Sequence, residues 1–153
     1  MNKKRLQNGL SYSIKLKTFP GATAADMAHY VKPALMAKPD VVILHVGTND
    51  IKNNSPEKVV QSICNLGKGI RNQQNKIDLI LSSIITRNDD PSLATKVTKC
   101  NKLLNDLCTE QNWGLIDNSN IDKYQLNSYG LHLNTKGSAS LAKNIKNYLK
   151  NIN

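Results

Sequence analysis

The sequence predicts an α/β fold in which a parallel β-sheet lies between two layers of helices. Short apolar runs alternate along the chain with segments whose apolar residues recur every three to four positions, which is the helical period. Residues 41–46 are apolar on both alternating faces except for one histidine, as is typical of a central strand in a parallel sheet. Because 153 residues suit one hydrophobic core, we expect a single three-layer α/β/α sandwich over residues 1–153.

Four segments are predicted to be strands. Residues 13–19 alternate polar and apolar side chains, which indicates a strand with one buried face. Residues 41–46 and 77–85 are rich in Val, Ile and Leu and are expected to be buried, and residues 113–117 are predicted to form a last short strand. The expected order is therefore β-α-β-α-β-α-β-α, and right-handed crossovers between parallel strands produce the sandwich.

Each predicted helix begins at a residue that can cap it. Thr23 and Asp26 form a capping-box pattern, and Pro33 is expected to kink or divide the helix that follows. The other predicted caps are Ser55, Asp90 and Asn134, the first two followed by proline at the position where a helix favours it. The side chains expected to face inward are those of Met27, Ala28, Val31, Leu35, Val59, Ile63, Leu66, Ile70, Leu93, Val97, Cys100, Leu104, Leu107, Leu141, Ala142, Ile145, Tyr148 and Leu149.

The chain is strongly basic, with 21 Lys and Arg against 11 Asp and Glu and a formal net charge of +10. Such a surface favours weak binding of nucleic acid or of an anionic membrane surface, although the lysines are dispersed and a merely solvated surface is the alternative. No apolar stretch approaches the roughly 20 residues of a membrane span, and the basic N-terminus lacks the apolar segment of a signal peptide. We expect a cytoplasmic protein.

The three cysteines, Cys64, Cys100 and Cys108, are odd in number, widely spaced and placed on the apolar side of predicted helices. This pattern predicts buried free thiols in a reducing compartment rather than a metal site or a redox pair. No Cys-x-x-Cys motif occurs, and we expect neither a metal nor a cofactor.

Candidate site residues follow or precede the predicted elements at one edge of the sheet. Gly21 follows the first predicted strand, Asn49 lies in the Gly-Thr-Asn-Asp turn after residues 41–46, and His132 precedes the last helix. The carboxyl ends of parallel strands form the ligand crevice of such folds. A backbone N–H at Gly21, an amide donor at Asn49 and a histidine are the parts of an ester hydrolase site without its nucleophile. The alternatives are a turn glycine, an Asx-type loop cap and an exposed helix-entry histidine.

Three blocks carry a family resemblance: Phe-Pro-Gly-Ala-Thr at 19–23, Gly-Thr-Asn-Asp at 47–50 and Gly-Leu-His-Leu-Asn at 130–134. In their order and spacing the chain, from about residue 4 to about residue 149, resembles the SGNH hydrolases, or GDSL esterase/lipase superfamily. It is most similar to the esterase-like domains of invertebrate retroelement-derived proteins. The resemblance implies a flavodoxin-like α/β/α sandwich, hydrolysis of acyl or acetyl esters through an acyl-serine without cofactor or metal, Gly21 and Asn49 as oxyanion donors, and His132 as general base.

Two departures from the family pattern concern catalysis. The Gly-Asp-Ser block that carries the nucleophile in the family is absent, and it and the first strand would lie upstream of residues 3–6. Tyr129 stands three residues before His132, where the family has an aspartate. A tyrosine hydroxyl, with an ordinary pKa of about 10, is neutral near pH 7 and cannot stabilise an imidazolium as a carboxylate does. Asp117 and Asp122 are the alternative partners for the ring.

These observations predict an ester hydrolase domain that lacks its first strand and nucleophile and is catalytically impaired as it stands. The second interpretation is a binding module that holds an acyl, acetyl or sugar ligand in the crevice, or nucleic acid on the basic surface. The third is a non-functional fragment. Ser11, Ser13, Ser82 and Ser83 are poor substitute nucleophiles because they precede or lie on predicted strands, where local hydrogen bonds account for them.

A parallel sheet without its first strand leaves backbone N–H and C=O groups unpaired, each costing about 1–3 kcal/mol if buried. We therefore predict that the domain is marginally stable or self-associates through open strand edges. Sedimentation analysis and a thermal melt check this prediction. A monomer with a sharp, cooperative melt in the range of intact domains contradicts it.

Overall fold

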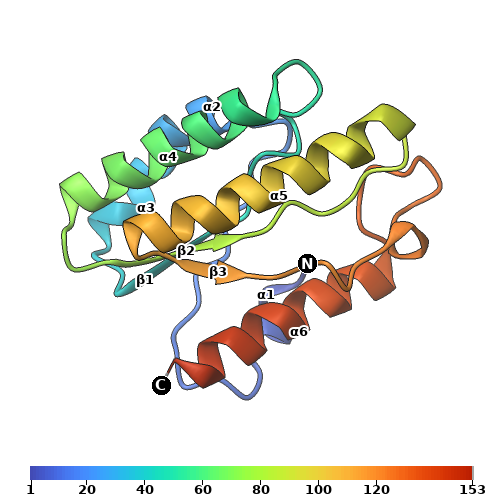
Figure 1. Ribbon diagram of the computed structural model, residues 1–153. Coiled ribbons are helices and arrows are strands. Elements are labelled where there is room, and N and C mark those ends of the chain that lie inside the picture. Colours follow the sequence, from blue (N-terminus) through green and yellow to red (C-terminus); the bar gives the residue numbers. More distant parts are fainter. Residues whose placement is uncertain (153) are drawn as a thin grey trace.

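The computed structural model describes residues 1–152 (Figure 1). Its centre is a parallel sheet with the order β1 (Val41–Leu44), β2 (Asp78–Ser82) and β3 (Gly114–Ile116). The β1–β2 register pairs Val41 with Asp78, and the β2–β3 register pairs Ile80 with Gly114. The predicted α/β class with a parallel sheet is confirmed, with each strand shorter than the apolar run that contains it.

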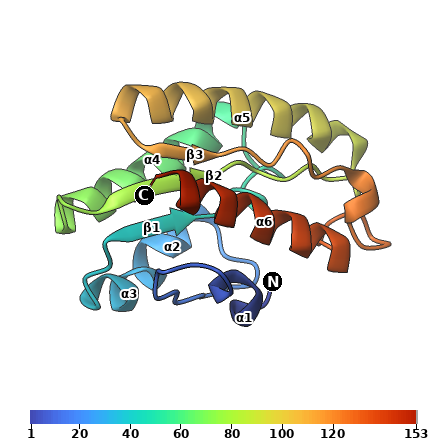
Figure 2. The ribbon, with the colours of Figure 1, turned by 90° about the horizontal axis from the view of Figure 1, so that it is seen from below.

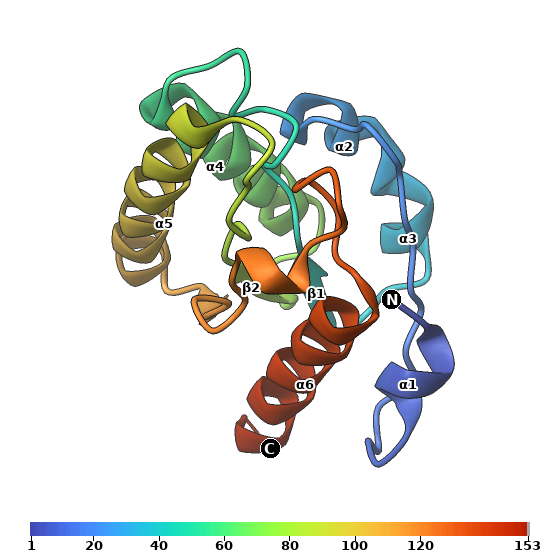
Figure 3. The same cartoon turned by 90° about the vertical axis from the view of Figure 1, so that its right-hand side faces the viewer.

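Helices cover both faces of the sheet, as Figures 1 and 3 show. Four helices pack on one face, and α1 and α6 pack against each other on the opposite face. The elements are α1 (Lys3–Gln7), α2 (Ala24–Tyr30), α3 (Lys32–Met36), α4 (Pro56–Gln73), α5 (Pro91–Gln111), the 3-10 helix η1 (Lys123–Gln125) and α6 (Thr135–Asn151).

Two hydrophobic cores result, because successive side chains of a strand point to opposite faces of the sheet. On β2, Leu79 and Leu81 belong to the larger core beneath α2–α5, whereas Ile80 belongs to the smaller core beneath α1 and α6. Leu6 of α1 and Leu141 of α6 are buried in the smaller core. The two helix layers of the sandwich therefore pack on opposite faces of the sheet through separate hydrophobic cores.

The predicted helix starts are confirmed. The Thr23 side chain accepts from the N–H of Asp26 and completes a capping box, and Pro33 lies in the first turn of α3, so the expected helix is divided. The other three caps, Ser55, Asp90 and Asn134, each accept a backbone N–H of their own helix. The prediction that Ala28 faces inward is wrong, because Ala24, Met27 and Val31 form the inward stripe of this seven-residue helix and Ala28 is exposed.

The prediction of a strand over residues 13–19 is wrong. The side chains do alternate as in a strand, since Ile14 and Leu16 are half-buried against the smaller core while Lys15 and Lys17 are exposed. The backbone forms no ladder, and the Gln7 side chain instead bonds the chain at residues 12 and 14. The segment runs on the β1 side of the sheet (Figures 2 and 3), where no strand of residues 1–152 pairs with the outer edge of β1.

The cysteines are buried free thiols, as predicted. Burial raises the pKa of the Cys100 and Cys108 thiols to about 11, so both are protonated and unreactive near neutral pH. Across residues 1–152, the helices are either too short or too polar to cross a bilayer.

The packing of α4 on β3 depends on a glycine. A Cβ on Gly67 would lie 2.6 Å from Cζ3 of the buried Trp113, whereas a Cβ on Gly69, two residues on, would meet no atom within 4 Å. We expect Gly67→Ala to lower the free energy of unfolding by about 1–3 kcal/mol through overpacking. We expect the matched control Gly69→Ala to raise it by up to about 1 kcal/mol, since alanine is the better helix former.

Urea unfolding followed by the fluorescence of Trp113, the single tryptophan, measures both effects. Equal effects of the two substitutions would show that the Gly67 contact has no bearing on stability.

Candidate functional site

The loops that follow the strands gather at one end of the sheet, on the right of Figure 1 and toward the viewer in Figure 3. The turn after β1 holds Asn49, and the loop that enters α6 holds His132. The loop that enters α2 holds Gly21 at the same end. The three site residues predicted from the sequence therefore lie on loops at the same end of the sheet.

The loop of Gly21 and the turn of Asn49 are joined directly. The Asn49 Nδ2 donates a hydrogen bond of 2.9 Å to the carbonyl of Ala22. Gly21 has a φ of +77°, a conformation that glycine adopts without strain. The stacked rings of Phe19 and Tyr30, with centroids 4.9 Å apart, hold the loop against α2. A backbone donor at Gly21 and an amide donor at Asn49 are therefore neighbours, and the amide keeps a second N–H.

Asp50 adds a second connection between these loops. Its carboxylate is 5% exposed, and both of its oxygens accept the N–H of Ala24, the first residue of α2, at 3.2 Å. Burial raises the pKa of Asp50, and the hydrogen bond from Ala24 opposes this rise. Asp50 therefore positions the start of α2 against the Asn49 turn.

His132 lies on a compact loop with an exposed side chain. Its carbonyl accepts the N–H of Asn127 at 2.6 Å, and its own N–H donates to Asn127 Oδ1 at 3.3 Å. Tyr129, at the position of the family's aspartate, is 80% exposed. Asp117 accepts bonds from Ser119, and Asp122 caps η1. In the described part of the chain, no carboxylate is hydrogen-bonded to the His132 ring.

A residue that sequence reasoning missed, Arg87, joins the Asn49 turn to the His132 loop. Its guanidinium is 5% exposed, donates to the carbonyl of Thr48 at 2.7 Å and forms a two-pronged ion pair with Asp89. The next residue, Asn88, donates its N–H to the carbonyl of Gly130 at 2.8 Å. The hydrogen bonds from Arg87 lower the pKa of Asp89, and the Asp89 carboxylate raises the pKa of Arg87. The only feature of the sequence that could have indicated this role was the position of the arginine just after an apolar strand.

Gly130 permits this connection. Its φ is +71°, and a Cβ there would lie 2.8 Å from the carbonyl carbon of Asn88. The backbone of the His132 loop can therefore approach the segment after β2 closely only with glycine at this position.

His45 and two of the four predicted poor nucleophiles, Ser82 and Ser83, belong to a polar network with Asn118. The His45 Nδ1 lies 3.0 Å from Ser82 Oγ, which also accepts the Asn118 side-chain N–H at 2.8 Å. Ser83 Oγ accepts the backbone N–H of Asn118. Both serines are at most 5% exposed, so each is occupied by local hydrogen bonds and shielded from a substrate.

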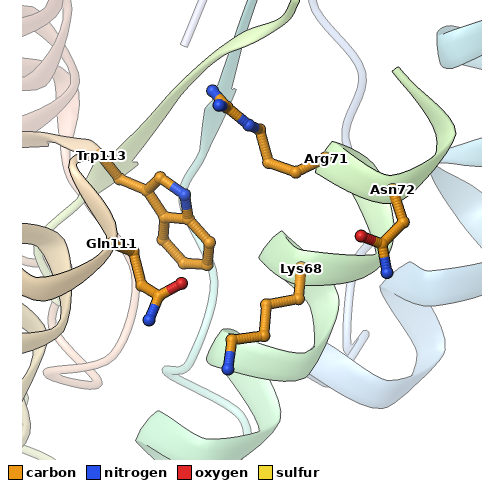
Figure 4. A pocket seen from close by; sticks show the side chains of 5 residues that line it. All are labelled: Lys68, Arg71, Asn72, Gln111 and Trp113. Carbon is orange, nitrogen blue, oxygen red and sulfur yellow. The ribbon is translucent and has the colours of Figure 1, made fainter. Parts of the chain in front are cut away.

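Two hollows on the protein surface are defined by the residues that line them. One, of about 340 Å³, lies at the end of α4 and is lined by Lys68, Arg71 and Trp113 among others (Figure 4). Arg71 there donates to the carbonyl of Ile77 at 2.7 Å. The other, of about 440 Å³, lies between the starts of α1 and α6 and borders the His132 loop, with Arg5 and Leu133 in its wall. Within residues 1–152, no three His, Cys, Asp or Glu side chains are grouped to hold a metal.

The sequence was compared with known families and proteins. Residues 3–139 match the sequence profile of the GDSL-like Lipase/Acylhydrolase family. Over 70 residues, 45% of this chain, the sequence is 34% identical to the platelet-activating factor acetylhydrolase IB subunit beta homolog of Drosophila melanogaster. The matched residues are 31% of that relative, so the chain spans about a third of its length.

Solved structures share the fold. A carbohydrate esterase family 3 protein from Talaromyces cellulolyticus superposes with a TM-score of 0.74 at 20% identity, over 86% of this chain and 68% of that one. A lipase/acylhydrolase from Enterococcus faecalis superposes with a TM-score of 0.71 at 21% identity, over 86% of this chain and 72% of that one. At these identities the likeness shows the fold, and it confirms the predicted sandwich.

The Arg87 connection makes a testable contribution to stability. We expect Arg87→Ala to lower the free energy of unfolding by about 1.5–3 kcal/mol, because it removes charge-assisted hydrogen bonds of a buried guanidinium. We expect faster amide exchange in residues 47–50 and 128–132. Chemical denaturation and hydrogen exchange measure these effects.

The pH dependence and a matched control identify the pair as the cause. Arg87 lowers the pKa of Asp89, so this contribution is present above the ordinary carboxyl pKa and is lost as pH falls through the lowered value. The difference between wild type and Arg87→Ala should therefore shrink below about pH 4. Lys99→Ala, which breaks the exposed pair with Glu57, should leave stability unchanged. The part of the difference that is due to the bond with the Thr48 carbonyl should remain at low pH. A difference of the same size at low and neutral pH would refute the role of the ion pair.

Proposed function

Because the chain belongs to the GDSL-like lipase/acylhydrolase family, we propose that it carries an ester hydrolase site for short acyl or acetyl esters. The observation that carries the proposal is the 2.9 Å bond from Asn49 to Ala22, which makes neighbours of the amide and the Gly21 loop. An acetyl ester also agrees with the name of the Drosophila relative, an acetylhydrolase.

In this site, each group acts on the charge that develops during acyl transfer. The Gly21 N–H and the free Asn49 N–H stabilise the oxyanion of the tetrahedral intermediate. His132 takes the proton of the attacking hydroxyl and returns it to the leaving group. Tyr129, in the position where the resemblance expects an aspartate, has no carboxylate with which to stabilise the imidazolium that forms during the reaction.

The nucleophile, we propose, belongs to a strand outside residues 1–153 that pairs with the outer edge of β1. The chain contains no Gly-Asp-Ser, and Ser82 on β2 and Ser83 directly after it are buried. The apolar residues Val41, Val42 and Ile43 remain half-buried, although their sequence is typical of a central strand. Without that strand the domain is impaired in catalysis, and the same edge is the route by which it would self-associate.

Origin and location complete the proposal. The blocks at 19–23, 47–50 and 130–134 support descent from an esterase-like domain of a retroelement-derived protein. The three buried free thiols support a reducing, cytoplasmic environment.

Two assays test the function. We expect residues 1–153 to show neither stoichiometric serine labelling by a fluorophosphonate nor turnover of p-nitrophenyl acetate. We expect both to appear when an upstream Gly-Asp-Ser strand is restored. In that restored protein, Asn49→Ala should lower kcat about 10²- to 10³-fold through loss of an oxyanion donor.

The control is Asn53→Ala, which changes an exposed asparagine of the same loop and should leave kcat unchanged. Stoichiometric labelling of a serine within residues 1–153 would contradict the proposed absence of a nucleophile. Equal losses from the Asn49 and Asn53 substitutions would contradict the proposed oxyanion site.

A further inference from the structure

The net charge of this protein is confined to the two ends of the chain. Residues 1–17 and 123–153 contain ten Lys and Arg and no Asp or Glu. Residues 26–122 contain all 11 acidic residues and the other 11 basic ones, so their formal charge is zero. The whole excess of +10 therefore comes from two segments that are far apart in the sequence.

The fold brings these two segments together. Helix α1 packs against α6, and side chains at residues 6, 10, 12, 14 and 16 share the smaller core with the buried face of α6. In Figure 1 both helices lie below the sheet, opposite α4 and α5. One layer of the sandwich, here called the basic layer (residues 1–17 and 123–152), thus carries the entire net charge. The acidic residues nearest to it in sequence, Asp117 and Asp122, lie at its border.

The lysines of α6 form a stripe on its outer surface. Lys136, Lys143 and Lys150 recur every seven residues and are all exposed, and Lys146 lies beside them. Seven residues are about two helical turns, so the stripe extends about 21 Å along the helix. The buried side chains of α6, including Leu141 and Ile145, point into the smaller core instead.

Two exposed aromatic rings lie in the segment that precedes α6. Tyr124 is 76% exposed and Tyr129 is 80% exposed. The Asn134 side chain, which caps α6, donates to the carbonyl of Tyr124 at 3.0 Å, so that tyrosine is held beside the first turn of α6. The Lys123 Nζ lies 5.2 Å from the centre of the Tyr124 ring.

We propose that the basic layer is a docking surface for single-stranded nucleic acid. A like-charged layer repels itself, and an evenly mixed surface would avoid this repulsion, so its segregation favours a polyanionic partner. Lysines along a path neutralise successive phosphates, and exposed tyrosines stack on unpaired bases. An anionic membrane has the same sign of charge but calls for inserted apolar side chains, whereas the exposed rings of this layer carry hydroxyls.

The test measures anisotropy of a fluorescein-labelled dT20 oligonucleotide against salt concentration. We expect binding at 50 mM salt that weakens as salt rises. The triple variant Lys136→Gln, Lys143→Gln, Lys150→Gln should bind at least tenfold more weakly, and its log–log salt slope should fall by about 2, from about 0.7 for each lost phosphate contact. Tyr124→Ala should bind about fivefold more weakly through loss of stacking.

A charge-matched control separates the basic layer from net charge. Lys52→Gln, Lys58→Gln, Lys102→Gln removes the same charge from exposed lysines outside the basic layer and should change the affinity less than threefold. Equal losses in the two triple variants, or no binding of the oligonucleotide at 50 mM salt, would overturn the proposal. So would lysine-dependent sedimentation with phosphatidylcholine–phosphatidylserine vesicles without oligonucleotide binding. Urea unfolding checks that each variant is folded.

Discussion

The pairing of backbone N–H and C=O groups along β1 is the constraint on which the rest of the structure depends. On one side, β1 pairs in register with β2, and that pairing supports both hydrophobic cores. On its other side no strand of residues 1–152 pairs with it. Residues 13–19, whose side chains alternate as in a strand, run on this side of the sheet without pairing with β1. The outer edge of β1 therefore lacks the backbone partners that a central strand has on both sides.

The site is held together by hydrogen bonds between loops that are distant in sequence. Asn49 bonds the loop before α2, Asp50 bonds the first N–H of α2, and Arg87 bonds the turn that holds Asn49. The neighbour of Arg87 then bonds the loop of His132. An active site that stabilises a transition state with fixed hydrogen-bond donors requires such pre-organisation, because each donor must be in place before the negative charge develops. The loops of this chain are connected in that way.

The two layers of the sandwich differ in their electrostatics. The layer of α2–α5 belongs to a part of the sequence with equal numbers of acidic and basic residues, whereas the basic layer contains both ends of the chain and all of the net charge. The loops that hold Gly21, Asn49 and His132 lie at one end of the sheet, the end that faces the viewer in Figure 3. The candidate site loops and the basic layer therefore belong to one small domain.

Local chemistry in the sequence was enough to predict the helices from α2 to α6 and the three strands β1, β2 and β3 in their order along the chain. The caps at Thr23, Ser55, Asp90 and Asn134 act within one turn of each helix, and the apolar periods report which face is buried. The sequence also indicated which residue types the candidate site would use. The roles of Gly21, Asn49 and His132 in catalysis stay predictions.

Only the tertiary structure decided which of these local tendencies was realised. Residues 13–19 have a strand pattern, but they form no ladder with the open edge of β1, and the Gln7 side chain bonds the backbone at residues 12 and 14 instead. The role of Arg87 depends on Thr48 and Asp89 meeting at its guanidinium, and a charged residue next to a strand does not reveal such partners. The basic layer likewise exists because folding packs α1 against α6. Neither the composition nor the local periodicity of the sequence predicts that contact.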